Sequence, residues 1–202
     1  AAQLKMANAY DNAVRAYTDA IRLNPSNPSL YVNLAQVQAA EGKLDEALQS
    51  IGFALQVKNN YLDAVYLLSQ VQAAKGDLKN AIISAQVATE INPQNPLLFF
   101  HLGLLEYNAQ TYDTAAQAFA KAVELEPNYA NAHYFLGLSA TRLNDSALAI
   151  AQFEELAKTN PDNQEVLLIL GNLRAGKSPF ANATPPVTPT PEKRKSLPVE
   201  EN

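Results

Sequence analysis

The side chains that most often perform metal or acid–base chemistry are scarce in this sequence. It has two histidines, His101 and His133, and no cysteine, which excludes disulfides, thiolate metal sites and a cysteine nucleophile. A metal site built on either histidine would need further ligands, and neither has a carboxylate or another histidine four residues along the chain. The sequence therefore predicts no metal and no cofactor, with both histidines in structural roles.

Other patterns typical of catalysis are also missing. Neither histidine is accompanied by a serine in a turn that could serve as a nucleophile. The segment GNLRAGKS at 171–178 resembles a phosphate-binding loop, but its spacing is wrong and no strand precedes it. The acidic pairs Glu154–Glu155 and Glu200–Glu201 are typical of solvated surface. We therefore expect no enzymatic activity from this chain.

Composition narrows the class of partner. The chain has 202 residues, of which 48% are apolar, so it is long enough to bury a sizeable core. Its 15 Lys and Arg against 20 Asp and Glu give a net charge of −5, and no basic stripe is present to neutralise phosphates. No uninterrupted apolar run is long enough for a membrane span. Nucleic-acid binding and membrane insertion by this segment are therefore not expected.

Small and apolar residues recur with a period of 34, and this period organises the whole chain. Each leucine in one of the columns is followed by a small residue, namely alanine, serine or glycine. The columns are Ala13, Ala47, Ala81, Ala115 and Ala149; Ala20, Ala54, Ala88, Ala122 and Leu156; and Leu34, Leu68, Leu102, Leu136 and Leu170. Between them, apolar residues fall at helical intervals of three and four, which predicts two helices in each unit.

The pattern resembles the tetratricopeptide repeat family, as in FFHLGLLEYNAQTYDTAAQAFAKAVELEPN at 99–128. The resemblance implies an all-α fold, a right-handed α-solenoid of antiparallel helix pairs that forms a superhelix. Departures from the family pattern are mild. Gln110 and Asn144 stand where Gly42 and Gly76 make the turn inside their repeats, and Asn59 replaces the usual closing proline.

The same phase divides the chain into units. We predict a half repeat at 1–27, full repeats at 28–61, 62–95, 96–129 and 130–163, and a capping helix at 164–176 with Glu165, Asn172 and Arg174 on its solvent side. In the half repeat, residues 1–7 are expected to end a first helix that pairs with a second at 10–23. Residues 177–202 are rich in proline and threonine and are predicted to be a disordered tail.

In this family the first helices of successive repeats line a concave groove, and the resemblance places ten side chains on that face here. Aromatic residues recur in one column, where they could offer large contact area with few rotatable bonds. Packing between neighbouring first helices is the alternative role for these rings. The predicted groove residues are Val32, Gln36, Tyr66, Gln70, Phe100, Leu104, Asn108, Tyr134, Leu138 and Arg142.

The groove residues also indicate which ligands to expect. Some co-chaperone members hold a peptide carboxylate with Lys, Arg and Asn in the groove. The matching places here carry Val32, Gln36, Leu67, Asn131 and Phe135, and only Asn33 agrees. Acidic chaperone tails held by such a basic clamp are therefore not expected, and an extended peptide or an amphipathic helix with apolar anchors suits the groove better.

Two hypotheses of function follow. The first is a non-catalytic scaffold that binds a protein segment in its groove. The second is that the chain is the soluble C-terminal repeat region of a larger bacterial membrane protein or enzyme, whose active part lies upstream of residue 1. The second hypothesis rests on the phase of the repeat, which places residue 1 inside a first helix.

Overall fold

The computed structural model describes the backbone of residues 2–181, and the side chains of residues 8–181. This part of the chain is helical with no strands, which confirms the expected all-α class. Its ten helices are α1 (Ala2–Leu23), α2 (Pro28–Ala40), α3 (Leu44–Val57), α4 (Leu62–Ala74), α5 (Leu78–Ile91), α6 (Pro96–Asn108), α7 (Tyr112–Leu125), α8 (Ala130–Arg142), α9 (Ser146–Thr159) and α10 (Gln164–Arg174).

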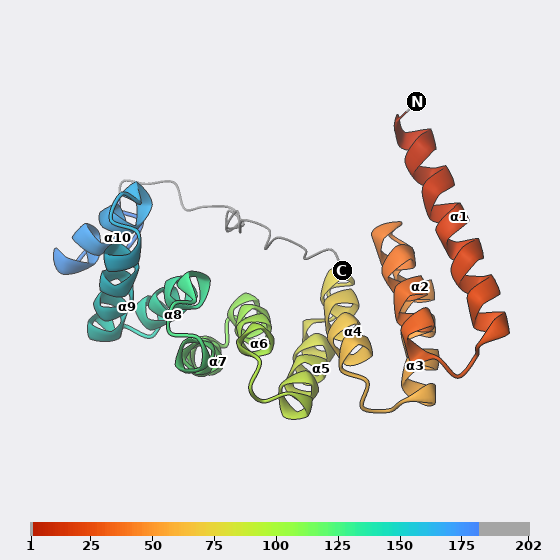
Figure 1. Ribbon diagram of the computed structural model, residues 1–202. Helices are drawn as coiled ribbons and strands as arrows, with labels where there is room; N and C mark the ends of the chain where they lie inside the picture. Colours follow the sequence, from red (N-terminus) through yellow and green to blue (C-terminus); the bar gives the residue numbers. More distant parts are fainter. Residues whose placement is uncertain (1, 182–202) are drawn as a thin grey trace, which may run out of the picture.

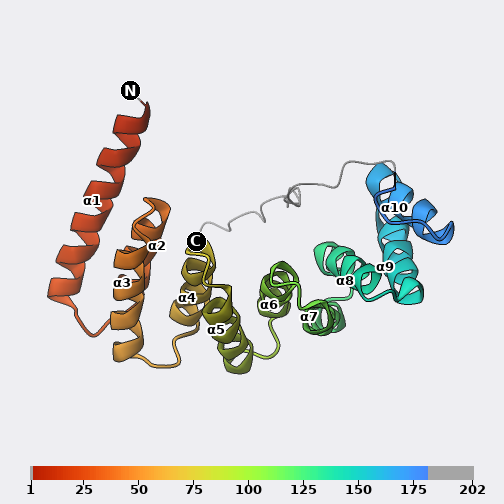
Figure 2. The same ribbon diagram turned by 180° about the vertical axis from the view of Figure 1, so that it is seen from behind.

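The helices stack in chain order into an arc with α1 at one end and α10 at the other (Figure 1). The first helices of the repeats, α2, α4, α6 and α8, lie along the inner side of the arc, and the second helices lie along its outer side (Figures 1 and 2). Each helix packs mainly against its neighbours in the chain, as expected for a solenoid whose repeats contact only adjacent repeats.

Alanine and glycine occupy the positions where neighbouring helices cross. Ala47, Ala81, Ala115 and Ala149 recur 34 residues apart and are completely buried. Gly103 and Gly137 provide space for a ring, because a Cβ added at Gly103 would lie 2.6 Å from Phe119 Cε1 and one at Gly137 would lie 2.7 Å from Phe153 Cε2. Both phenylalanines are themselves fully buried. The small-residue columns therefore mark the places where neighbouring helices approach most closely.

Helix ends are set by local side chains. Asn27, Asn95 and Asn163 recur at intervals of two repeats and cap α2, α6 and α10 by accepting hydrogen bonds from the first turn of the helix. The turn inside each repeat needs a left-handed residue, and Gln110 and Asn144 adopt it, with φ of 63° and 62°. The missing glycines therefore leave the turn geometry intact in both repeats.

The first helix differs from the prediction. A turn was expected near residue 8, but α1 runs unbroken from Ala2 to Leu23. At the turn position the other repeats have two long helices whose packing compensates for the broken helical hydrogen bonds. Neither glycine nor proline occurs between Ala2 and Leu23, so nothing local ends the helix, and continuing it keeps its backbone hydrogen bonds.

Residues 177–181, at the start of the predicted tail, are packed on the solenoid. After α10, Gly176 takes a φ of 66°, and Lys177 N donates to Asn172 O at 2.9 Å. Phe180 packs against the core between α8 and α10. Asn172, which was expected on the solvent side, is only 9% exposed and donates through Nδ2 to the carbonyls of Pro179 and Ala181. The rest of the predicted tail, 182–202, lies outside the described residues.

Two glycine-to-alanine changes should have opposite effects on stability. Gly103→Ala places a methyl group against the immobile ring of Phe119 and should lower the free energy of unfolding by about 1–3 kcal/mol. Gly171→Ala meets no atom within 4 Å and should raise it by up to about 1 kcal/mol, because alanine favours helix over glycine. Denaturant unfolding of both variants measures this difference. Equal shifts for the two would contradict the assigned helix crossing.

Candidate functional site

The inner side of the arc is hollowed between α2 and α4. The hollow has a volume of about 320 Å³ and contains four of the ten predicted groove residues, two from each helix. It is lined by Ser29, Val32, Asn33, Gln36, Tyr61, Asp63, Tyr66, Leu67 and Gln70. We call this site the α2–α4 hollow.

The α2–α4 hollow combines an apolar floor with polar walls. Val32 and Leu67 are 3% and 7% exposed and belong to the core between the two helices. Gln36 and Gln70 stand one helical turn further along and are solvent-exposed. At the other end the hydroxyls of Ser29 and Tyr61 lie 2.9 Å apart and join α2 to the residue that precedes α4. The wall therefore offers amide groups to a ligand, with Asp63 as the one charged lining residue.

Tyr66 is positioned by a buried cluster below it. Its ring meets the ring of His101, on α6, edge to face with centroids 5.0 Å apart. His101 Nε2 lies 2.8 Å from the Oγ of Ser69, one turn along from Tyr66 on α4. Burial raises the pKa of Tyr66, and a hydrogen bond with Gln70 opposes that change. The groove ring of one repeat thus rests on a side chain of the next repeat.

The close approach of Ser69 and His101 superficially resembles a nucleophile and its general base. Ser69 is completely buried, so a substrate has no access to its hydroxyl. Burial also lowers the pKa of His101 to about 4, which makes the ring a weak base near neutral pH. The pair is best understood as a hydrogen bond that joins α4 to α6.

The aromatic residues further along the groove are engaged in packing. The Phe100 ring lies 4.9 Å from the ring of Tyr129 and 5.9 Å from that of Phe135, centroid to centroid. Leu104 packs against the same core. Tyr134 packs on Phe135, and its hydroxyl donates to Glu165 at 2.7 Å. These contacts tie α6, α8 and α10 together. Of the three equivalent rings Tyr66, Phe100 and Tyr134, Tyr66 is therefore the one that lines the α2–α4 hollow.

A second pocket, with a volume of about 380 Å³, lies at the other end of the arc, where the C-terminal turn meets α8. It includes the predicted residues Leu138 and Arg142, and Lys177 from the turn. Arg142 is held over the ring of Tyr112 at 5.7 Å and by a hydrogen bond with Tyr107, which raises the pKa of the guanidinium. We call this site the Arg142 pocket. Asn108, the tenth predicted residue, is exposed at the end of α6.

Several buried polar contacts were not found from the sequence. Ser50 donates to Gln38 and Ser84 donates to Gln72, each at 2.7 Å, and the two pairs are one repeat apart. One period further on, Glu106 is 7% exposed and accepts hydrogen bonds from Thr111 and Thr114. The period of 34 was the signal that could have revealed these pairs, which lock the first helix of a repeat to the second.

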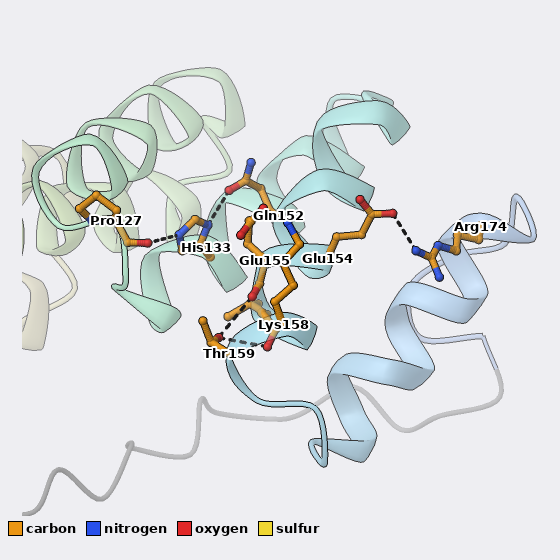
Figure 3. Close-up of polar contacts among 9 residues, drawn as sticks. Pro127, His133, Gln152, Glu154, Glu155, Lys158, Thr159 and Arg174 are labelled. Atoms are coloured by element: carbon orange, nitrogen blue, oxygen red, sulfur yellow. Dashed lines mark hydrogen bonds and ion pairs between the residues drawn. The ribbon is translucent and has the colours of Figure 1, made fainter.

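His133 has a comparable structural role. Its Nε2 donates to the carbonyl of Pro127 at 2.8 Å, and its Nδ1 lies 2.7 Å from Gln152 Oε1 (Figure 3). Both ring nitrogens are therefore engaged, one with the end of the preceding repeat and one within the same repeat. Within residues 8–181, no group of three His, Asp or Glu side chains is arranged to hold a metal ion. No described helix combines the length and the apolar content needed to cross a lipid bilayer.

These features define an α-solenoid scaffold of helix pairs with a concave inner face. Models of the tetratricopeptide repeat match residues 62–95, 100–164 and 136–181, and a model described as TPR repeat matches 6–42. The chain belongs to the tetratricopeptide repeat family. This fold is a non-catalytic scaffold type that serves protein interaction.

Curated relatives are much longer proteins. Tetratricopeptide repeat protein 8 of Caenorhabditis elegans is 24% identical over 164 residues, which cover 80% of this chain and 32% of the relative. Anaphase-promoting complex subunit 3 of Schizosaccharomyces pombe is 24% identical, with 81% of this chain and 25% of that protein covered. The human protein O-mannosyl-transferase TMTC1 is 27% identical, with coverage of 75% and 19%. The chain thus spans a third or less of each relative.

Solved structures agree in fold. MamA is 20% identical with a TM-score of 0.70, and the match covers 79% of this chain and 93% of MamA. YrrB, described as a TPR protein with an unusual peptide-binding site, is 24% identical with a TM-score of 0.67, and the match covers 82% and 85% of the two chains. At these identities the likeness concerns the fold alone.

The buried His101 should make the solenoid sensitive to acid. Its folded pKa of about 4 lies below the ordinary value of 6.5, so the unfolded chain takes up the proton first. The folded state is favoured fully by the neutral His101 ring above pH 6.5, and this contribution to the unfolding free energy is lost as the pH falls towards 4. Over that range the wild type should lose about 2–3 kcal/mol more unfolding free energy than His101→Gln, which keeps a polar partner for Ser69. Parallel losses in urea titrations would contradict the lowered pKa.

Proposed function

We propose that the concave face binds an extended protein segment whose backbone lies across the α2–α4 hollow. The observation that carries this proposal is the set of amides, from Asn33, Gln36 and Gln70, around the apolar floor. An amide side chain offers both a donor and an acceptor, so it can pair with the peptide groups of any extended sequence. The floor would take one apolar side chain, and Tyr66 would cover it.

The amides also favour an extended ligand over an amphipathic helix, the other form suggested by the sequence. A helix has already paired its backbone groups, except at its ends, and would leave the amides of the hollow unused. An extended segment presents unpaired N–H and C=O groups along its length. Affinity would then come from backbone hydrogen bonds and one apolar anchor, with little demand on the rest of the sequence.

Charge has a minor part in this site. The helix α2 carries no charged residue, and α4 carries only Asp63. Raising the salt concentration from about 50 to 500 mM should therefore change affinity by less than about twofold. This distinguishes the proposed mode from a basic clamp, for which affinity would fall steeply with salt.

Peptides selected from a random display library on the full chain provide the test. Gln36→Ala and Gln70→Ala should each weaken binding of the selected peptides by about fivefold, or about 1 kcal/mol, through loss of a hydrogen bond. Both side chains are exposed, so the unfolding free energy should stay within about 0.5 kcal/mol of the wild type. Gln49→Ala, at an exposed position on α3 outside the hollow, is the matched control.

Two results would count against the hollow as the binding site. One is that Gln49→Ala weakens binding as much as the changes at Gln36 and Gln70. The other is that peptides bind normally to a variant whose hollow is filled by Gln70→Trp. Tyr66→Ala is less informative by itself, because the ring also packs on His101. The peptide affinity of this variant must therefore be compared with its melting temperature.

The relatives favour a second, wider role for the same surface. Each curated relative extends well beyond the matched segment, which favours a role for these repeats as one module of a longer protein. In that arrangement the groove would position whatever machinery the rest of the chain provides. The full reading frame, together with its expressed product, tests this directly: a mature protein no longer than these 202 residues would exclude it.

A further inference from the structure

The Arg142 pocket differs from the α2–α4 hollow in its charge. Arg142 and Lys177 both line it, and neither forms an ion pair with any acid in the described part of the chain. Two cations on α9 and α10 are different: Lys158 pairs with Glu155 at 2.5 Å and Arg174 pairs with Glu154 at 2.7 Å (Figure 3). Two uncompensated positive charges therefore meet at one pocket of a chain whose net charge is −5.

Neutral contacts orient the Arg142 side chain, and a backbone turn places Lys177. The Arg142 guanidinium lies over the Tyr112 ring and beside the Tyr107 hydroxyl, which orient it without cancelling its charge. Lys177 is placed by the backbone turn after α10, where its own N–H is bonded to Asn172 O. Asp145, the acid nearest in sequence to Arg142, directs its Oδ1 to Leu148 N at the start of α9.

The other walls of the pocket suit a peptide. Leu138, Leu173 and Phe180 supply apolar surface, and Thr141, Ser146 and Ser178 supply hydroxyls beside the two cations. A planar guanidinium pairs with both oxygens of a carboxylate. We propose that the Arg142 pocket binds an acidic side chain of a protein segment, with the carboxylate between Arg142 and Lys177 and an apolar neighbour on the Phe180 side. This site does not require the α2–α4 hollow to bind anything.

Residues 197–202 of the chain, LPVEEN, offer a convenient probe because they combine two acids with apolar neighbours. The test uses this hexapeptide, acetylated and amidated, and a second version with glutamine at both glutamates. The host is the full chain carrying Glu200→Gln and Glu201→Gln, so that its own acidic pair cannot compete. Binding is measured by fluorescence anisotropy at low salt, and the melting temperature of every host variant is recorded.

The glutamate peptide should bind about tenfold more tightly than the glutamine peptide, as expected for charged hydrogen bonds. Arg142→Gln should abolish most of that preference, and Arg142→Lys should restore only part of it. Arg142 and Lys177 are both exposed. Lys177→Gln should weaken binding by about two- to fivefold, less than Arg142→Gln, because an ammonium acts as a point charge and does not pair with both oxygens of a carboxylate. Lys158→Gln, which removes an exposed cation outside the pocket, should leave affinity within about twofold.

Three outcomes would overturn the proposal. Equal affinity for the two peptides would mean that the carboxylates are not recognised. An equal loss with Lys158→Gln and Arg142→Gln at unchanged melting temperature would indicate general attraction to surface charge. Binding of a phosphoserine version of the peptide without binding of the glutamate version would show that the pocket requires a phosphoryl group. None of these results bears on the α2–α4 hollow, whose test uses other residues and other peptides.

Discussion

Close approach of helix backbones is the constraint on which this structure depends. Ala47, Ala81, Ala115 and Ala149 are completely buried at equivalent places, and at the crossing of α6 with α7 even a methyl group on Gly103 would collide with Phe119. A helix pair cannot bury its apolar face alone, so stability comes from these repeated crossings and from the contacts between adjacent pairs. The positions of the inner helices, and therefore the shape of the groove, follow from that packing.

This constraint divides the groove into two kinds of surface. Further along the arc, the rings of Phe100 and Tyr134 join neighbouring helices, so packing occupies these two predicted groove residues. In the N-terminal half the core between α2 and α4 is built from smaller side chains such as Val32 and Leu67. Because those residues fill less space, a hollow remains above them. The size of the packed side chains therefore decides which predicted groove residues line a hollow.

The 34-residue period made the fold predictable, because each column reports one place in the packing. Boundaries set by strong local signals, such as Asn27–Pro28 and Asn95–Pro96, could also be predicted. The unbroken α1 could not, because the repeat phase suggested a turn near residue 8, where neither glycine nor proline ends the helix. The packing of residues 177–181 on the solenoid could not be predicted either, because it depends on Phe180 and on the side-chain amide of Asn172.

The candidate site was predictable only in part. Repeat phase placed Val32, Gln36, Tyr66 and Gln70 on one face, and all four line the same hollow. The position of an aromatic residue in the repeat does not show whether its ring lines the groove or packs between helices, because both kinds of ring recur every 34 residues. The Arg142 pocket was also hidden, because Lys177 is brought to Arg142 by a turn beyond the last repeat.

A crystal structure of the full chain with a peptide selected on it would test the central claim most directly. The account predicts an extended segment in the α2–α4 hollow, with its backbone bonded to the amides of Gln36 and Gln70 and one apolar side chain above Val32 and Leu67. A peptide bound as a helix, or seated on the outer helices, would contradict it.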